Sequence, residues 1–363
     1  MLRELGWKRN FGKTVDRFEA WWAGEMIDRP PVTLHVKLTR AYTGPTKSHA
    51  AIRDRWLDVE YVVERAAAEM EPREWVGDAF PLFNPNVGPE VTATLLGCEL
   101  EFSEDSSWST PVVREAADWE RIIAMEADFD NPYWRTIERM TDYAIDVSGG
   151  RFMVGMTDLH GNYDILGALR DPQALCLDLM DCPQLVRRAG RKAAAVYNEA
   201  FRRSYAKVSG AGMGSTCWTP FVHDGPAYVP SSDFWCMVSR EMARDMVLPD
   251  IVTEMQGLGR SVFHLDGPTA LQHLDLLLEM PRLNAVQWVF GAGHGPAARW
   301  IEVYRRILAA GKGVQVLAAD AADVMRVLEE IGCRGVWVCV GEAFDTAGEA
   351  ESFLGQVERM ACG

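Results

Sequence analysis

The sequence lacks several features that define specialised protein classes. Its eight cysteines are irregularly spaced and form no Cys-x-x-Cys pair, which indicates reduced core thiols. No apolar run reaches membrane-spanning length, and the N-terminal text MLRELGWKRNFGK has no apolar signal core. No Pro/Gly/Ser-rich or low-complexity segment divides the chain. We therefore expect one cytoplasmic domain over residues 1–363.

Basic residues are also scarce. The chain has 37 Lys and Arg against 52 Asp and Glu, a formal net charge of −15. Nucleic acids and anionic membranes bind basic surfaces, so we expect neither as a partner. A local basic pocket for a small anionic substrate remains compatible with this charge. The apolar content of 48% is ordinary for a globular protein.

The C-terminal half alternates between β-branched apolar stretches and helical text. The predicted strands are 260–264, 285–290, 314–318 and 335–340, and each is followed by an amphipathic segment such as DAADVMRVLEEIG. Four consecutive strand–helix units predict a parallel sheet with helices packed against it.

The N-terminal half supplies four further candidate strands, at 31–38, 76–82, 152–156 and 212–218. Helical text fills the intervals, and Asp171-Pro172 is typical of a helix start. A total of eight strands favours a closed barrel over an open sheet. We therefore predict an α/β fold, a TIM (β/α)8 barrel with an N-terminal helical extension and a hairpin inserted near 98–113.

Enzymes of the TIM-barrel class place their chemistry at the C-terminal ends of the strands. Only seven histidines occur in the chain. Five of them lie at or just after the ends of predicted strands: His160, His223, His264, His273 and His294. We expect a catalytic group of Asp158, His160, His264 and Asp266, and substrate contacts from Trp218, His223, Trp288 and His294. The alternative interpretation is structural: Asp266-Gly267 also suits a simple turn.

Four segments carry a resemblance to a known family. They are RFEAWWAGEMIDRPPV, MTDLHGNYDILGALRD, SSDFWCMVSREMARDMVLPDI and SVFHLDGPTALQHLDLLLEMPRLNAVQWV. In their spacing the chain resembles the uroporphyrinogen decarboxylase-like superfamily, best over 152–340. The resemblance implies a TIM-type barrel with a cleft at its C-terminal face. The family contains tetrapyrrole decarboxylases, zinc-dependent methyltransferases that exchange a methyl group between a corrinoid protein and a thiol or other acceptor, and many members of unknown activity.

The decarboxylases of this family carry an arginine-rich loop of the form Met-Arg-Gln-Ala-Gly-Arg-Tyr, which holds the substrate carboxylates. The nearest basic text here, residues 2–13, lacks that pattern. We therefore predict that the chain is not a true uroporphyrinogen decarboxylase.

The methyltransferases of the family bind zinc through His-x-Cys at a strand end and a later Cys. At the matching positions this sequence has His264, Asp266 and Cys339, so the resemblance implies a zinc site with one carboxylate in place of a thiolate. The replacement makes the donor set harder and shifts its metal preference. The alternatives are a metal-free site with Asp266 as general base, and a Cys339 that only fills the core.

Three functions remain open. The first is a cobalamin-linked methyltransferase or demethylase component that uses zinc, a small-molecule substrate and a corrinoid protein as partner. The second is a metal-free lyase or decarboxylase of a small organic substrate in the same barrel. The third is a non-catalytic binding protein, in which the polar residues would be dispersed or blocked. We expect a homodimer only because dimers are common among proteins in general.

Overall fold

A curled parallel sheet is the centre of the molecule. The computed structural model describes residues 2–38, 40 and 42–362. Six strands follow one another in the order β1-β10-β9-β8-β7-β6, and every neighbouring pair is parallel. Their bounds are Val32–Thr33 (β1), Ala227–Tyr228 (β6), Arg260–Asp266 (β7), Ala285–Val289 (β8), Gly313–Ala318 (β9) and Val336–Val340 (β10). The order contains no reversal, which is the arrangement of a barrel and not of a doubly wound sheet.

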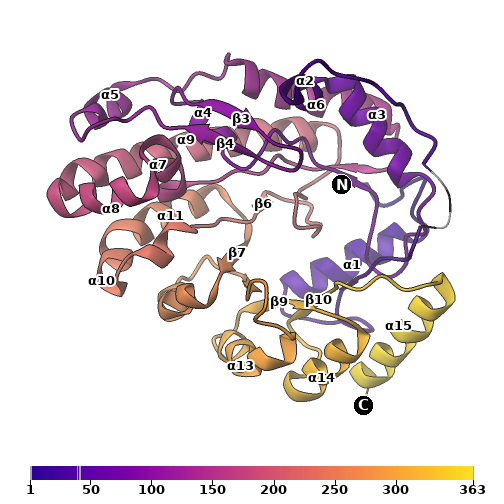
Figure 1. The fold of residues 1–363 in the computed structure, drawn as a ribbon. Helices are drawn as coiled ribbons and strands as arrows, with labels where there is room; N and C mark the ends of the chain where they lie inside the picture. The colour runs from indigo at the N-terminus through magenta and orange to yellow at the C-terminus, as the bar shows by residue number, and fades with distance from the viewer. Residues whose placement is uncertain (1, 39, 41, 363) are drawn as a thin grey trace.

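Two further strands complete the wall, β2 (Leu82–Phe83) and β5 (Met153–Val154), which pair in parallel. Single backbone hydrogen bonds join this pair to its neighbours. Asp78 N donates to Val32 O (2.8 Å) on one side, and Met156 N donates to Thr216 O (2.9 Å) on the other. Figure 1 shows the helices arranged around the outside of the sheet. The predicted (β/α)8 barrel is confirmed.

The N-terminal half differs from the prediction in detail. The second strand is short and lies at the end of the expected 76–82 segment. The expected strand at 212–218 forms no ladder and makes one antiparallel bridge, between Ser215 and His223. The side chain of Ser215 explains this, because its hydroxyl donates to Gly225 O (2.7 Å) and accepts from Ala227 N (2.9 Å). The chain therefore turns back on itself here.

The helices and the inserted hairpin follow the sequence closely. The hairpin consists of β3 (Glu99–Phe102) and β4 (Ser107–Thr110), and it lies in the predicted interval. Asp171 caps its helix as expected, accepting from Gln173 N and Ala174 N. The α-helices are α1 (Phe11–Trp22), α2 (Ile52–Leu57), α3 (Val59–Met70), α4 (Val91–Thr94), α5 (Asp118–Ala124), α6 (Pro132–Ser148), α7 (Asn162–Arg170), α8 (Pro172–Asp181), α9 (Pro183–Gly210), α10 (Arg240–Met242), α11 (Leu248–Glu254), α12 (Leu274–Leu278), α13 (Ile301–Ala309), α14 (Ala321–Ile331) and α15 (Ala347–Cys362).

Short non-α helices complete the list. They are η1 (Phe234–Met237), η2 (Ala243–Val247, a π-helix), η3 (Met255–Gly257), η4 (Pro268–His273) and η5 (Ala297–Trp300). Within the described part of the chain, no helix combines the length and the apolarity needed to cross a membrane.

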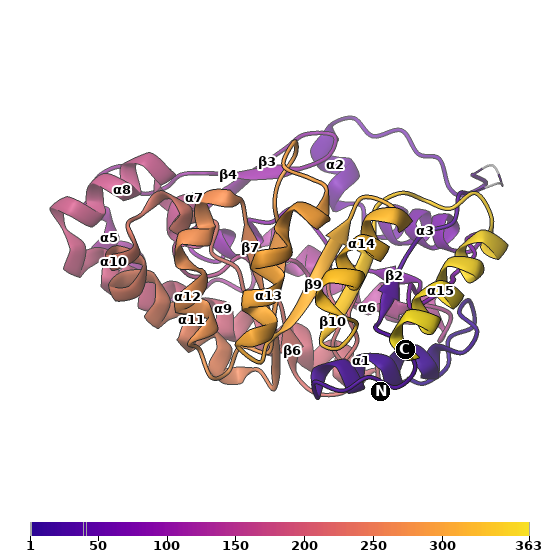
Figure 2. The ribbon, with the colours of Figure 1, turned by 90° about the horizontal axis from the view of Figure 1, so that it is seen from below.

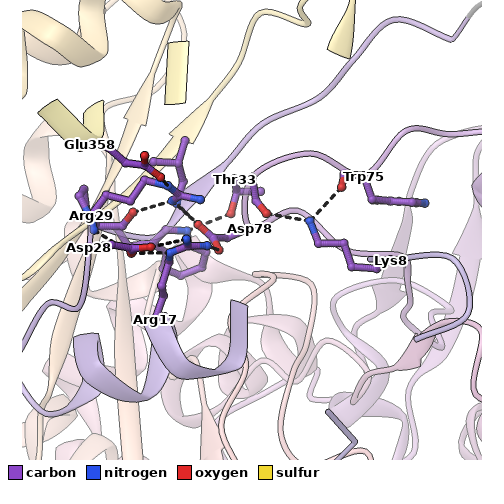
Figure 3. A network of polar contacts seen from close by, with 12 residues as sticks. Lys8, Arg17, Asp28, Arg29, Thr33, Trp75, Asp78 and Glu358 are labelled. Carbon is purple, nitrogen blue, oxygen red and sulfur yellow. Dashed lines mark hydrogen bonds and ion pairs between the residues drawn. The ribbon is translucent and has the colours of Figure 1, made fainter. Parts of the chain in front are cut away.

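Helix α1 covers the N-terminal end of the barrel, because Trp21 Nε1 donates to Gly335 O (3.0 Å) just before β10. A buried polar network fixes it there (Figure 3). The carboxylate of Asp78 accepts from Arg17 (3.0 Å), from Arg29 (2.5 Å) and from Val32 N (2.9 Å). Figure 2 shows α1 at one end of the barrel and the β3–β4 hairpin at the other. The C-terminal ends of the strands are thus left for the site.

Candidate active site

The C-terminal end of β7 carries two of the predicted residues, His264 and Asp266. They lie two positions apart and therefore point to the same face of the strand. Gly267 follows with φ of +80°, which favours glycine, and its N–H donates to Val289 O (2.9 Å). The turn that the sequence suggested is present, and it holds the Asp266 carboxylate at the mouth of the barrel.

A third side chain that could hold a metal ion comes from a residue that the sequence did not single out, Asp233. One ligand atom from each of Asp233, His264 and Asp266 lies within 4.8 Å of the others. The His264 Nε2 and Asp233 Oδ1 atoms are 4.0 Å apart. Asp233 reaches this position because His264 N donates to Pro230 O (3.0 Å), which draws the segment after β6 alongside β7. Asp233 stands within SSDFWCM, a segment noted only for its resemblance.

A row of amide side chains fixes the orientation of His264. Its Nδ1 bonds to the amide oxygen of Gln287, the residue opposite it on β8. The other end of the Gln287 amide donates to Gln315 Oε1 (2.8 Å), and its oxygen faces the imidazole. A carbonyl oxygen only accepts, and Nδ1 therefore carries the proton. The lone pair of Nε2 then faces the two carboxylates.

Cys339 is not part of this cluster, which corrects the predicted ligand set of His264, Asp266 and Cys339. Its Sγ accepts from Gln315 Nε2 (3.1 Å), and the side chains of Gln287 and Gln315 lie between it and His264. Strands β8 and β9 separate the two residues, and each contributes a buried glutamine to the gap. Burial raises the pKa of the Cys339 thiol to about 11.

A second polar pair follows β5. His160 Nε2 lies 3.9 Å from Asp158 Oδ2. The loop that carries them is fixed by Tyr228, whose hydroxyl donates to Thr157 O (2.6 Å) and accepts from Leu159 N (2.8 Å). Burial raises the pKa of Asp158. Burial opposes the charged form of His160, but the neighbouring carboxylates outweigh it and raise the pKa of this imidazole.

The glycine after His160 has a structural reason. A Cβ atom at Gly161 would lie 2.3 Å from Glu254 Oε1. The Glu254 carboxylate instead accepts from Asn162 N (2.5 Å) and Asn162 Nδ2 (2.9 Å), which fixes the start of α7. The polar pair is thereby held on a rigid turn.

Helix α7 also supplies Asp164, which links the two groups. Its carboxylate accepts from Asp233 N (3.0 Å) and Phe234 N (2.8 Å). Burial and the adjacent charge of Asp233 raise the pKa of Asp164 to about 6. A cavity of about 500 Å³ opens beside it and is lined by His160, Asp164 and Asp233 together with residues of the hairpin and of η1.

Of the four predicted substrate contacts, the structure brings one to the cluster. The Trp218 ring meets the His264 ring edge-on, with centroids 5.3 Å apart and an interplanar angle of 84°. His294 follows β8 on an exposed loop, and its backbone oxygen accepts from Trp300 Nε1 (3.0 Å).

The other two contacts are corrected by the structure. Trp288 is fully buried against Trp300 in the helix layer, because Gln287 next to it points into the barrel and side chains alternate along a strand. His223 Nδ1 lies 3.0 Å from Glu19 on α1, at the N-terminal end, because the chain turns back after Trp218.

Comparisons with known proteins bear on the fold. No protein-family model matches the sequence, and no curated protein matches it. Among solved structures, a methyltransferase from Methanosarcina mazei aligns at TM-score 0.61 and 14% identity, over 95% of this chain and 98% of that one. A B12-independent methionine synthase from Shewanella sp. W3-18-1, in complex with selenomethionine, aligns at TM-score 0.40 and 10% identity, over 92% and 97% of the two chains. The second likeness is too distant to support an argument. The fold of this chain is therefore the (β/α)8 barrel predicted from the sequence, shared over nearly its whole length with the Methanosarcina methyltransferase.

Proposed function

We propose that this chain is an enzyme that transfers a methyl group to or from a small molecule, at a divalent metal ion bound by Asp233, His264 and Asp266. The observation that carries the proposal is the approach of these three donors to within 4.8 Å of one another at the C-terminal end of β7. This is the end at which barrel enzymes place their chemistry. The fold shared with a methyltransferase supports the choice of reaction.

The donor set fits such a metal. Catalytic zinc takes three protein ligands and leaves a position open, and His and Asp are both among its usual ligands. Gln287 fixes the tautomer in which the Nε2 lone pair of His264 is available, as a hydrogen-bond partner behind a metal ligand does. Two carboxylates with one imidazole also suit harder ions such as Mn²⁺ or Fe²⁺. When bound, the ion would act as a Lewis acid that lowers the pKa of a coordinated acceptor.

The neighbouring residues have separate roles in this proposal. Asp158 and His160 form the acid/base pair, because His160 Nε2 lies 3.9 Å from Asp158 Oδ2 and its pKa is raised. His160 would give a proton to the demethylated product or take one from the acceptor. Trp218, edge-on to His264, would exclude water from one side of the metal.

The methyl carrier in this proposal is a corrinoid held by a partner protein, as the family resemblance implies. We keep a homodimer as a further expectation. A direct assay would mix the purified chain with methylcobalamin and a thiol acceptor, with and without added Zn²⁺, and follow loss of the methyl–cobalt absorbance.

Metal analysis is the first test. We expect close to one equivalent of metal in the wild type and little in His264→Ala or Asp233→Asn. His49→Gln is the matched control, since His49 bonds to Asp58 at the start of α3 and should leave the metal content unchanged. Negligible metal in every protein would contradict the proposal.

A metal-free lyase or decarboxylase is the second candidate. It is favoured by one observation: His160 and Asp164 line a cavity, Asp158 lies 3.9 Å from His160, and the pKa values of all three are raised. Activity that survives complete chelation would favour this candidate. The third hypothesis, a non-catalytic binding protein with dispersed polar groups, gains no support from this arrangement.

A further inference from the structure

The charge of the cavity beside the ligand cluster is one-sided. Four carboxylates line it, from Glu90, Asp164, Asp171 and Asp233, and its described lining contains no lysine or arginine. His160 is the one group there that can carry a positive charge, and Asp158 lies 3.9 Å behind it. Glu90, Asp164 and Asp171 accept hydrogen bonds from backbone N–H groups only, so a substrate with a carboxylate or phosphate group would meet negative charge that no lysine or arginine of the described lining offsets.

The same cavity exposes apolar surface. Trp108 on β4 keeps 47% of its surface exposed and Met237 on η1 keeps 48%, although both are large apolar residues. Phe234, Pro111 and Pro172 complete this side of the lining. The hairpin that carries Trp108 is fixed, because Ser109 N donates to the Glu90 carboxylate (2.5 Å). An exposed indole ring that shares a cavity with carboxylates is the arrangement that binds an organic cation.

We infer that the substrate of this enzyme is an alkylated ammonium cation, which binds with its alkyl groups against Trp108 and Met237 and its charge toward Glu90 and Asp171. That the ligand is a substrate rests on the proposed function. Its chemical class rests on the residues that line the cavity. An onium ion of this kind satisfies both surfaces at once. Its positive charge is attracted by the quadrupole of the indole ring and by the carboxylates, and the burial of its alkyl groups is favourable. The cavity volume of about 500 Å³ suits a small molecule of this class.

Binding of two isosteric probes tests the charge requirement. Choline and 3,3-dimethyl-1-butanol have the same shape, but only choline is charged. In calorimetric titrations of the wild-type protein we expect choline to bind at least about tenfold more tightly than 3,3-dimethyl-1-butanol. A partly desolvated cation–π contact contributes an affinity gain of roughly this size. Equal affinity for the two probes, or no binding of choline, would overturn the inference.

Substitutions test the location. Trp108→Leu should weaken choline binding about fivefold, whereas Trp108→Phe, which keeps a ring face, should retain most of it. Asp171→Asn removes one charge but can still cap α8, so we expect a threefold loss without unfolding. Asp181→Asn, at the exposed far end of the same helix, is the matched control and should bind as the wild type does. Unchanged binding in both Trp108→Leu and Asp171→Asn would place the cation elsewhere and refute the assignment.

The two proposals fail separately. Choline binding measured on chelated protein does not depend on the metal, so a missing metal would remove the proposed function and leave the cation site standing. Normal metal content with no preference for choline would remove the cation site and leave the proposed function standing.

Discussion

The imidazole Nδ1 of His264 bonds to the side-chain oxygen of Gln287, its register partner on the adjacent strand. The contact is part of a row across four neighbouring strands, since Gln287 donates to Gln315 and Gln315 donates to the thiol of Cys339. Each amide fixes the orientation of the next, and the row ends by presenting the Nε2 atom of His264 to Asp233 and Asp266.

Gln287→Leu should therefore lower metal affinity about 10- to 100-fold, which is the usual effect of losing the hydrogen-bond partner behind a metal-binding histidine. The substitution nearly conserves volume, so the fold should survive. Gln287→Glu keeps the acceptor oxygen and should retain more affinity than Gln287→Leu. Competition with a chromophoric chelator measures both constants, and identical constants in all three proteins would refute the role of this contact.

Replacing Cys339 should leave the metal content unchanged. The thiol lies behind two glutamines and is outside the ligand cluster, so Cys339→Ser should bind as much metal as the wild type. Its pKa of about 11 also predicts slow alkylation at neutral pH, whereas the exposed Cys362 should react first. Mass spectrometry of peptides after a timed iodoacetamide pulse gives the order. A marked loss of metal in Cys339→Ser would restore Cys339 as a ligand.

Stability should fall as the pH rises, through Asp250. This carboxylate is buried on α11, its Oδ2 has no hydrogen-bond partner, and burial raises its pKa from 3.8 to about 7. Because the folded-state pKa is the higher one, the folded protein binds the proton more tightly. The stabilising contribution is therefore complete below pH 3.8 and is lost as the pH rises toward 7. The difference corresponds to at most about 4 kcal/mol, at 1.36 kcal/mol per pKa unit.

Asp250→Asn should remove this part of the pH dependence and stabilise the protein above pH 7. Urea unfolding at several pH values from 5 to 8 tests the expectation. Parallel profiles for the wild type and the variant would show that Asp250 does not titrate as described.

Trp288→Ala should destabilise the fold without affecting the site. Its ring is buried against Trp300 on the helix side of β8, so truncation should cost about 3–5 kcal/mol of unfolding free energy. Trp288→Phe should cost less. Metal content per folded molecule should stay at the wild-type level in both, and a selective loss of metal in the stable Trp288→Phe protein would place this ring at the site after all.

The sequence was sufficient for the architecture because its signal is local. Strand–helix alternation in the C-terminal half predicted β7 to β10 within one or two residues. The same reasoning placed His264 and Asp266 at a strand end, since a parallel barrel puts all such ends on one face. The weak point was the segment 212–218, where the hydroxyl of Ser215 bonds to the returning chain and no ladder forms.

Tertiary structure alone decided which side chains meet. Asp233 lies beside His264 only because the chain after β6 runs alongside β7. The two residues belong to no common sequence motif. Cys339 and Trp288 were placed at the site by their positions on strands. However, side chains point to alternate faces along a strand, so a position on a strand does not say which face a residue lines. The closure of the barrel then sets how far apart two strands lie. The sequence by itself determined the barrel and the end at which the site forms, whereas register and closure determined its members.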